Sequence, residues 1–359
     1  MNEAINRPAT PDGEDVICAT EGPIGRLRLH RPKALNALNM GMCESMLGAL
    51  EGWAADGAVA AVMIDHAEGR GFCAGGDIRL LADSGAGDGA AARAFFFAEY
   101  RLNHRLFTFA KPTVAVMDGI TMGGGVGLAL PCRYRIATEN TRLAMPETGI
   151  GLFPDVGGGW YLSRLPGRMG QYIALTGTRL NGADCLALGL ATHHVAAATL
   201  PALKRALIER PVAEMASILD GMAEVPGEGT LAAHRDAIDQ LFAADALEDI
   251  LAALEAADSA FAAETLATLR SKSPQAMKVS LRLLHDGAQM ASFADEMAQE
   301  YAVATRVVQR HDFVEGVRAV IVDKDHAPRW QPATAADVTD HVIDQIFAPL
   351  SADAAWSPA

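Results

Sequence analysis

The sequence predicts an α/β protein whose last part is mostly helical. Through the first 200 residues, short apolar runs alternate with glycine-rich turns and helical stretches, a pattern typical of strands that alternate with helices. From about residue 200, alanine, leucine, glutamate and lysine dominate, and strand-like runs disappear through Phe347. We therefore expect a region 1–200 that carries the functional site and a mostly helical region 201–359.

The first region contains three apolar runs that predict buried strands, namely Ile24–Leu29, Val59–Ile64 and Thr113–Met117. A helix is predicted over Asn39–Trp53, because Asn39 is a good N-cap and apolar residues recur behind it. The last dozen residues, ending in Trp356-Ser357-Pro358-Ala359, are expected to be loose.

Charge and hydropathy exclude two classes of partner. The chain has 44 acidic and 30 basic residues, a formal net charge of −14. Nucleic acid and anionic membranes attract basic surfaces, so neither is an expected partner. Half of the residues are hydrophobic, but no run of 18 apolar residues appears, so no membrane-spanning helix is expected.

The five cysteines are scattered and odd in number, with no C-x-x-C pair, and therefore predict free thiols rather than a disulfide framework or a zinc site. No metal site is expected elsewhere either, since the neighbours His193 and His194 are unsuited to binding one zinc together. The segment Met1–Asp15 has neither the apolar core of a secretory signal nor the arginines of a transit peptide. A cytoplasmic protein is therefore expected.

Two glycine-rich loops offer unobstructed backbone amides. The first is Gly71–Ile78, which contains Ala74-Gly75-Gly76-Asp77, and the second is Met117–Leu128, which contains Gly123-Gly124-Gly125. A phosphate cradle would need a lysine-bearing G-x-x-x-x-G-K motif, which the chain lacks. An oxyanion hole fits better, because each loop can give one N–H to a carbonyl oxygen that gains charge. The alternatives are a tight turn before a helix capped by Asp77 and close helix–strand packing at the second loop.

Glu147 and Asp155 lie eight positions apart in an apolar segment that runs from Ala144 to Gly159. Carboxyls among apolar side chains lose hydration, which raises their pKa towards values useful for proton transfer. The alternative is structural: Glu147 would cap the turn that begins at Pro146, and Asp155 would cap a helix that begins at Val156.

A third acid, Glu99, falls on an apolar helical stripe. Phe95, Glu99, Leu102 and Leu106 are spaced 4, 3 and 4 residues apart, so they share one face of a helix. An acid on such a face is paired, protonated or directed into a polar cavity. Pairing with Arg101 or Arg105 is the alternative interpretation.

Together these features resemble the crotonase (enoyl-CoA hydratase/isomerase) superfamily, and within it the 3-hydroxyisobutyryl-CoA hydrolases. The resemblance begins at His30–Leu38, passes through both glycine loops and is most specific over Met145–Gly159. It ends near Asp312–Ala319 and Asp323–Asp325, which resemble the hydrolases in particular. The resemblance implies a crotonase-like ββα spiral core followed by the helical C-terminal part.

The resemblance also implies roles for particular residues. Gly76 and Gly124 match the two oxyanion-hole positions, and Glu147 and Asp155 match the catalytic acids. Glu99 matches a substrate-contacting glutamate, and Gly124, Glu147 and Asp155 match further substrate-binding positions. The residues that match the coenzyme A-binding segments are Lys33, Ala34, Leu35, Ala74, Asp77 and Ile78.

One departure from the superfamily pattern bears on the reaction. Hydratases of the superfamily carry a second catalytic glutamate three residues after the middle glycine of the triple-glycine loop, and this chain has Gly127 there. Because syn addition of water uses two carboxylates around one water, the departure disfavours a hydratase.

The sequence thus predicts a hydrolase of acyl-CoA thioesters, with 3-hydroxyisobutyryl-CoA of valine breakdown as the implied substrate. Coenzyme A would be part of that substrate, so no separate cofactor is expected. The alternatives are an enoyl-CoA isomerase or hydratase and, outside enzymes, a silent CoA-binding scaffold. Superfamily members often form trimers or paired trimers, which makes a homo-oligomer one of the states that the resemblance allows.

Overall fold

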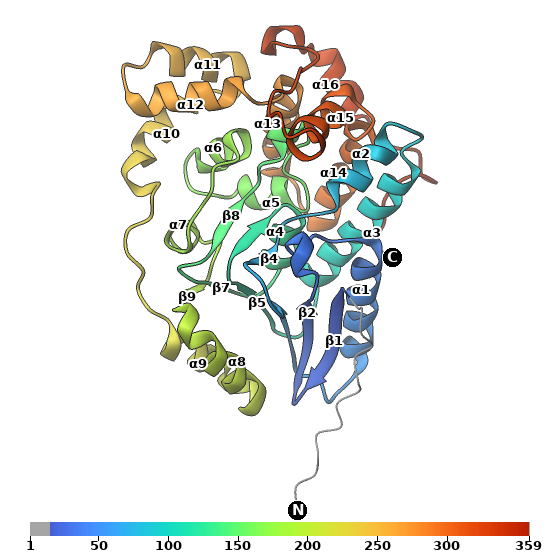
Figure 1. Ribbon diagram of the computed structural model, residues 1–359, viewed down its shortest axis with the longest axis vertical. Coiled ribbons are helices and arrows are strands. Elements are labelled where there is room, and N and C mark those ends of the chain that lie inside the picture. Colours follow the sequence, from blue (N-terminus) through green and yellow to red (C-terminus); the bar gives the residue numbers. More distant parts are fainter. Residues whose placement is uncertain (1–14, 359) are drawn as a thin grey trace, which may run out of the picture.

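The structure is a computed structural model that describes residues 15–358. The expectation about targeting signals concerns residues 1–14 and lies outside the described residues. Two sheets form the centre of the first region (Figure 1). The larger has six strands in the order β1-β2-β3-β5-β7-β9, and the smaller has three in the order β4-β6-β8. All pairs are parallel except β1 with β2.

The strands of the larger sheet are β1 (Val16–Glu21), β2 (Ile24–Leu29), β3 (Ala61–His66), β5 (Thr113–Met117), β7 (Tyr134–Ala137) and β9 (His193–His194). Those of the smaller sheet are β4 (Gly71–Cys73), β6 (Ile120–Met122) and β8 (Arg142–Ala144). Each of β3, β5 and β7 is followed by a short strand in the other sheet and then by helical structure. The predicted ββα spiral is therefore confirmed.

Helices pack around this core (Figure 1). Those before residue 190 are α1 (Met40–Ala55), α2 (Ile78–Gly85), α3 (Ala90–Phe107), α4 (Gly124–Ala129), α5 (Gly158–Leu162), α6 (Met169–Thr176) and α7 (Gly182–Ala187). The predicted first helix is confirmed: the side-chain oxygen of Asn39 accepts a hydrogen bond from the amide of Met42 at 2.9 Å.

The predicted strands agree with the structure except at one boundary. β2 and β5 have the predicted bounds, whereas β3 begins at Ala61 rather than Val59. The reason is the register with β2, whose first residue Ile24 pairs with Ala61. Residues 59–60 therefore lie before the first hydrogen-bonded pair of β2 and β3.

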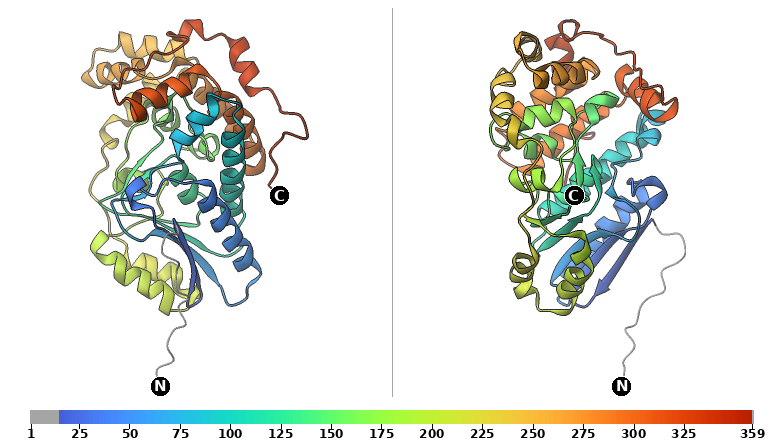
Figure 2. Two further views of the ribbon diagram at one scale, coloured as in Figure 1. Left: turned by 45° about the vertical axis from the view of Figure 1, so that its right-hand side comes forward. Right: turned by 60° about the vertical axis from the view of Figure 1, so that its left-hand side comes forward.

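The described part of the region after residue 200 consists of helices and loops and contains no strand. Its helices are α8 (Leu200–Glu209), α9 (Met215–Met222), α10 (Arg235–Leu241), α11 (Leu247–Ala256), α12 (Ala260–Arg270), α13 (Pro274–Gly287), α14 (Phe293–Val307), α15 (His311–Val317) and α16 (Asp340–Phe347). A π-helical turn, Arg318–Val322, follows α15. Helices α8 and α9 lie beside the larger sheet, and the others gather at the opposite end of the molecule (Figures 1 and 2).

Side chains from both regions share one hydrophobic core. Leu27 and Phe72 from the first region and Leu283, Met297 and Phe313 from the second are fully buried in the same cluster. The division near residue 200 coincides with the end of the strands and otherwise stays a prediction.

The expectation of a loose C-terminal tail is wrong at Trp356. Its side chain is 5% exposed, and the indole N–H donates to the carbonyl oxygen of Phe97 on α3 at 3.3 Å. A large aromatic ring with one polar atom is well suited to such an anchor, because burial of the ring outweighs the ordering of a short tail.

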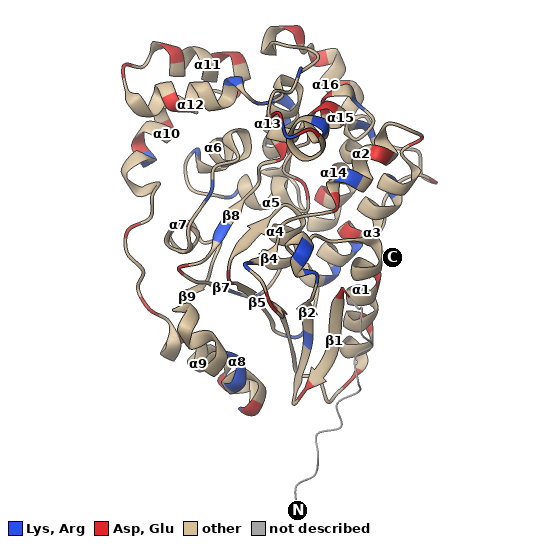
Figure 3. Cartoon of the chain, in the orientation of Figure 1, with Lys and Arg blue, Asp and Glu red and all other residues tan. Residues whose placement is uncertain are grey.

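Charged residues are scattered over helices from both regions in the view of Figure 3. Within residues 15–358, no helix has the length and apolar character needed to cross a membrane. No disulfide joins the cysteines among the described residues; four are buried and Cys18 is exposed.

Candidate active site

A cavity of ≈ 450 Å³ lies where the two glycine loops meet α3 and the segment that follows β8. Its wall includes Gly76 and Gly124 from the loops, Glu99 from α3, and Glu147 and Asp155 from the segment after β8. These five residues, predicted from four separate stretches of sequence, are thus brought together in one place. Apolar side chains such as Phe95, Phe96 and Leu152 fill the spaces between them.

The two glycine loops are in contact. A Cβ atom added to Gly124 would lie 3.4 Å from the carbonyl carbon of Gly75 and 2.3 Å from Oε1 of Glu99, so only glycine fits this position. Among the described residues, no carbonyl accepts a hydrogen bond from the amide of Gly76 or of Gly124. Gly124 begins α4, where the first amides of a helix have no partner within it. Both amides therefore remain available to a ligand.

Glu147 is the first residue of a 3₁₀ turn, Glu147–Ile150, and its side chain is buried. It caps no helix end, and its Oε2 has no hydrogen-bond partner among the described residues. A Cβ atom on Gly123 would lie 3.1 Å from Oε1, which places the carboxyl beside the second glycine loop. Burial, and then the neighbouring charge of Asp155, raise the pKa of Glu147 well above its usual range.

Asp155 does not cap a helix either, so that structural alternative is wrong. Helix α5 begins at Gly158 with Gly157 at its N-cap, and the Asp155 side chain turns instead towards α3. Its Oδ2 accepts a hydrogen bond from the hydroxyl of Tyr100 at 2.8 Å. Burial raises the pKa of Asp155 to about 6, although the Tyr100 hydroxyl opposes that rise.

Glu99 forms no ion pair with the arginines of its own helix. The guanidinium of Arg101 lies over the ring of Phe97, and that of Arg105 lies over the ring of Phe109. Glu99 is 2% exposed, and its Oε1 has no hydrogen-bond partner among the described residues. Burial, and then the charges of Asp155 and Glu147, raise its pKa well above the usual range. The three carboxyls therefore form one coupled group in which protonation of one favours ionisation of the others.

The residues expected to bind coenzyme A fall into two sets. Ala74 and Ile78 line the cavity. Lys33, Ala34 and Leu35 lie in the adjoining turn, where the carbonyl oxygen of Leu35 accepts the amide of Ala74 at 3.0 Å.

Asp77 stands at the N-terminal end of α2, but its side chain forms no capping hydrogen bond. It pairs with Arg31 at 3.2 Å instead, because that guanidinium lies within reach. The capping interpretation of Asp77 is therefore wrong, and no structural feature places the Asp77 carboxylate in the cavity wall.

Several residues of the cavity wall were not predicted from the sequence. Lys272, Val320, Ile321 and His326 come from the C-terminal region and line the same cavity. Burial lowers the pKa of Lys272. Nothing in the periodicity marks these residues, although the nearby stretch Asp312–Asp325 carries the resemblance to the hydrolases. Tyr100 was missed as a partner of Asp155 because 55 residues separate them.

Gly127 cannot be exchanged for the glutamate of a hydratase without moving its neighbours. A Cβ atom there would lie 2.6 Å from Cβ of Val156 and 2.8 Å from Nδ2 of Asn103. Both distances are too short for non-bonded atoms, so the fold around α4 leaves no room for a second glutamate.

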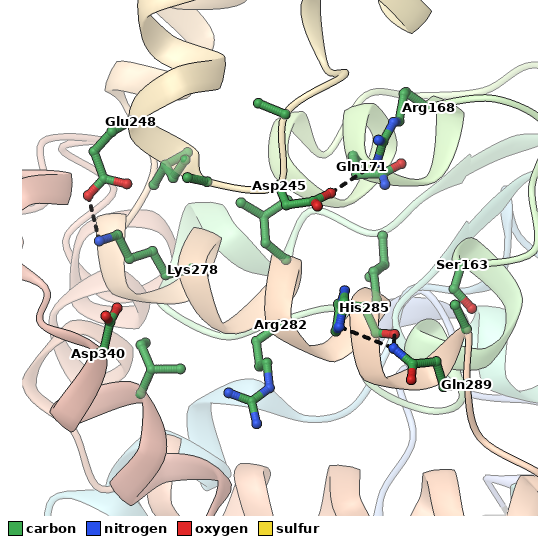
Figure 4. A pocket seen from close by; sticks show the side chains of 17 residues that line it. Ser163, Arg168, Gln171, Asp245, Glu248, Lys278, Arg282, His285, Gln289 and Asp340 are labelled. Carbon is green, nitrogen blue, oxygen red and sulfur yellow. Dashed lines mark hydrogen bonds and ion pairs between the residues drawn. The ribbon is translucent and has the colours of Figure 1, made fainter.

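A second cavity of ≈ 420 Å³ lies among α6, α11, α13 and α16 (Figure 4). Its charges are largely paired with each other: Lys278 with Glu248 at 2.6 Å and Arg168 with Asp245 at 3.3 Å. None of the predicted site residues lines it. Across residues 15–358 we find no cluster of three or more His, Cys, Asp or Glu side chains arranged to hold a metal ion.

The geometry agrees with a comparison to known families. The family model described as enoyl-CoA hydratase/isomerase matches residues 24–347. The chain belongs to the enoyl-CoA hydratase/isomerase family. Curated relatives within this crotonase family include the 3-hydroxyisobutyryl-CoA hydrolase of Gallus gallus, 41% identical over 95% of this chain and 90% of its own length. The human 3-hydroxyisobutyryl-CoA hydrolase is 39% identical over 95% of this chain and 90% of its own length.

Solved structures of the family show the same fold. A protein described as a carnitinyl-CoA dehydratase from Mycobacterium thermoresistibile is 42% identical, with a TM-score of 0.90 over 94% of this chain and 98% of its own. A protein described as an enoyl-CoA hydratase from Rhodobacter sphaeroides is 40% identical, with a TM-score of 0.89 over 96% of this chain and 100% of its own.

The prediction of a cytoplasmic location is wrong by this comparison. The curated relatives, including those of Gallus gallus, Danio rerio and Homo sapiens, are each named as mitochondrial enzymes. The prediction rested on the composition of the N-terminal segment, which is a weak signal of location.

Proposed function

We propose that this family member hydrolyses acyl-CoA thioesters, with 3-hydroxyisobutyryl-CoA as substrate and 3-hydroxyisobutyrate and free coenzyme A as products. One observation supports the proposal most directly. The amides of Gly76 and Gly124, which have no hydrogen-bond partner among the described residues, lie in the same cavity as the buried carboxyl of Glu147. The names of the curated relatives support the choice of substrate and imply a place in valine breakdown.

The amides of Gly76 and Gly124 act on the thioester carbonyl. As a nucleophile adds to the carbonyl carbon, the oxygen gains negative charge and accepts hydrogen bonds from both amides. In enzymes where one such donor has been removed, the barrier rises by about 3 kcal/mol. Apolar side chains around the loops, such as Phe95 and Leu152, lower the local polarity and so strengthen these hydrogen bonds.

Glu147 supplies the nucleophile by one of two routes. As a general base it takes a proton from water, and the oxygen of that water attacks the carbonyl carbon. The tetrahedral intermediate then collapses, the C–S bond breaks, and the departing coenzyme A thiolate takes up the proton. As a nucleophile its own oxygen attacks, expels the coenzyme A thiolate and leaves an anhydride that water then opens. Single turnovers in ¹⁸O-labelled water separate the routes, because label enters the Glu147 carboxyl only through the anhydride.

Asp155 and Glu99 recognise the hydroxyl group that distinguishes this acyl chain. Both carboxyls line the cavity beside Glu147, and each can accept a hydrogen bond from the substrate hydroxyl or from the attacking water. The proposed chemistry uses only amide and carboxyl groups of the chain. Coenzyme A enters as part of the substrate, and Lys33, Ala34, Leu35, Ala74, Asp77 and Ile78 remain the proposed residues of its binding segment.

The decisive experiment replaces Glu147 with glutamine and measures release of free thiol from 3-hydroxyisobutyryl-CoA. We expect kcat to fall by at least about 1,000-fold, because the amide neither takes a proton from water nor attacks the thioester. Thiol release at a near-normal rate from Glu147→Gln would overturn the assignment. Crotonyl-CoA offered to the unaltered protein tests the hydratase alternative, and the absence of a cavity position for a second glutamate predicts no hydration.

A further inference from the structure

A second pair of buried acids lies behind the cavity, on α14 of the C-terminal region. Glu296 and Glu300 are both 0% exposed, and they are four residues apart, so they lie one turn apart on the same face of the helix. Neither residue lines the cavity that contains Glu147. The mechanism described above gives them no role, and two buried carboxyls are costly to keep without one.

Glu300 holds the turn that follows Asp155. Its Oε2 accepts the amide of Gly157 at 2.8 Å, and its Oε1 accepts the amide of Gly159 at 3.2 Å. The same turn is closed by a hydrogen bond from the amide of Gly158 to the carbonyl oxygen of Asp155 at 2.9 Å. One carboxylate therefore ties together the backbone directly after the proposed catalytic aspartate.

The backbone conformation of this turn is strained and needs hydrogen bonds to hold it. Val156 has a φ of 55° and Gly157 a φ of 91°, so both central residues of the turn are in the left-handed region. A β-branched residue rarely adopts this conformation, which is strained and persists only where the surroundings impose it. The two charge-assisted hydrogen bonds that Glu300 accepts from the amides of Gly157 and Gly159 impose this conformation.

Glu296 completes the arrangement as the proton carrier of the pair. No described backbone amide donates to it, whereas Glu300 receives two. Hydrogen bonds from amides favour the ionised form of a carboxyl, and Glu300 accepts two of them, so we assign the charge of the pair to Glu300 and its proton to Glu296. Burial raises the pKa of both carboxyls, and that of Glu296 to about 7, so the pair does not readily carry two charges at neutral pH. The amide hydrogen bonds of Gly157 and Gly159 oppose this rise at Glu300.

Room for Glu296 comes from glycines on the facing segments. A Cβ atom on Gly159 would lie 1.9 Å from Oε1 of Glu296, and one on Gly287 would lie 3.0 Å from Oε2. The other charged or titratable groups that influence the pair come from α3, α13, α5 and the segments that flank α5; they are Tyr100, Asp155, Tyr161, Arg164 and Asp286.

We propose that Glu300, with a proton held by Glu296, is a positioning residue that fixes the turn 155–159 and so places the Asp155 carboxylate against Tyr100 in the cavity. This inference rests on the proposed thioesterase function. It makes the C-terminal region part of the catalytic apparatus, through an interaction that spans 143 residues of sequence.

Glu300→Gln tests the proposal. The amide keeps the size of the side chain but accepts only one of the two backbone N–H groups and carries no charge. We expect kcat for 3-hydroxyisobutyryl-CoA to fall between about 10- and 100-fold, with a smaller change in KM, because a displaced group weakens the chemical step more than binding. Loss of the nearby negative charge also moves the acid limb of the kcat/KM profile to lower pH, an effect that a purely structural role would not produce.

Two further variants make the test decisive. Glu296→Gln imitates the protonated acid, so it should lower kcat far less than Glu300→Gln. Asp184→Asn is the matched control, because Asp184 is 2% exposed and likewise accepts a backbone amide, that of Leu231 at 3.0 Å, outside the cavity. It should lower the melting temperature while the pH profile stays unchanged.

Wild-type kcat and an unshifted acid limb in Glu300→Gln would overturn the inference, as would a Glu296→Gln variant as impaired as Glu300→Gln. If the unaltered protein released no thiol from 3-hydroxyisobutyryl-CoA, the proposed function itself would fail instead. Melting curves of all three variants identify a change in activity that comes only from unfolding.

Discussion

In the proposed mechanism Glu147 acts on the thioester only when its carboxyl is ionised, so the surroundings of this carboxyl control the rate at a given pH. The side chain is buried and lies near Asp155 and Glu99, which are themselves buried acids. Burial and neighbouring negative charge both favour the protonated form. The pKa of Glu147 is therefore raised. As the pH falls, activity should be lost at a higher pH than it would be if the catalytic glutamate were exposed to solvent.

The first prediction from this feature concerns kcat/KM measured from pH 5 to pH 9. We expect it to fall as the pH decreases through the raised pKa of the carboxyl group, with an inflection clearly above the ordinary glutamate value of about 4.3. Asp155→Asn removes a neighbouring negative charge and should move this inflection to lower pH, while kcat also falls. An inflection at the ordinary value in the unaltered protein would contradict the raised pKa.

At the scale of the element, α4 shows how a local packing requirement limits the chemistry of the site. Gly124 at its start leaves space for Glu99, and Gly127 in its second half leaves space for Val156 and Asn103. The helix is therefore packed too closely on its neighbours to carry a side chain at either position. This packing also links α4 to the turn that positions Asp155.

Gly127→Ala tests this packing. We expect the free energy of unfolding to fall by about 1–3 kcal/mol, since the added methyl group must displace Val156 or Asn103. Thiol release should also fall, because Val156 is adjacent to Asp155. Gly48→Ala in α1 is the control: no atom lies within 4 Å of the added carbon, so the substitution should stabilise by about 0.5–1 kcal/mol.

Features that depend on neighbouring residues in the sequence could be predicted, whereas contacts made by the tertiary fold could not. The strand at Ile24–Leu29 and the cap at Asn39 depend on neighbouring residues, and both are confirmed. The bond of Tyr100 to Asp155 and the anchoring of Trp356 depend on the tertiary fold, and no local pattern predicts them.

Glu300 was missed although a signal existed. Glu296, Glu300, Val303 and Val307 repeat the spacing of 4, 3 and 4 residues that singled out Glu99 on α3. Applied to Phe293–Val307, the same argument marks an acid on a buried helical face. The partner of that acid, the turn at Gly157, could not be predicted, because it lies far away in sequence.

At the scale of the whole molecule, the C-terminal helices complete both the core and the site. Leu283, Met297 and Phe313 are buried in the same cluster as the strands, and Lys272 and Ile321 line the cavity. The two regions separated at residue 200 therefore depend on each other for burial of their apolar side chains.

Unfolding experiments test this dependence. We expect the complete chain to unfold in one cooperative transition, with coincident curves from circular dichroism and tryptophan fluorescence. A fragment of residues 1–200 should show no such transition, because it exposes the apolar surface that α13 and α14 cover. Two separate transitions in the complete chain, or a cooperatively folded fragment, would show that the first region is independent.

The gathering of Glu99, Glu147 and Asp155 in one cavity has a consequence for the end of the catalytic cycle. The proposed substrate enters with an uncharged thioester at the reacting carbon, and the acid that forms there is an anion at neutral pH. A carboxyl of this group that is ionised repels that anion, so the group of acids that promotes cleavage also favours departure of the cleaved acid. We therefore expect 3-hydroxyisobutyrate to be a weak inhibitor, with turnover limited by steps other than its escape.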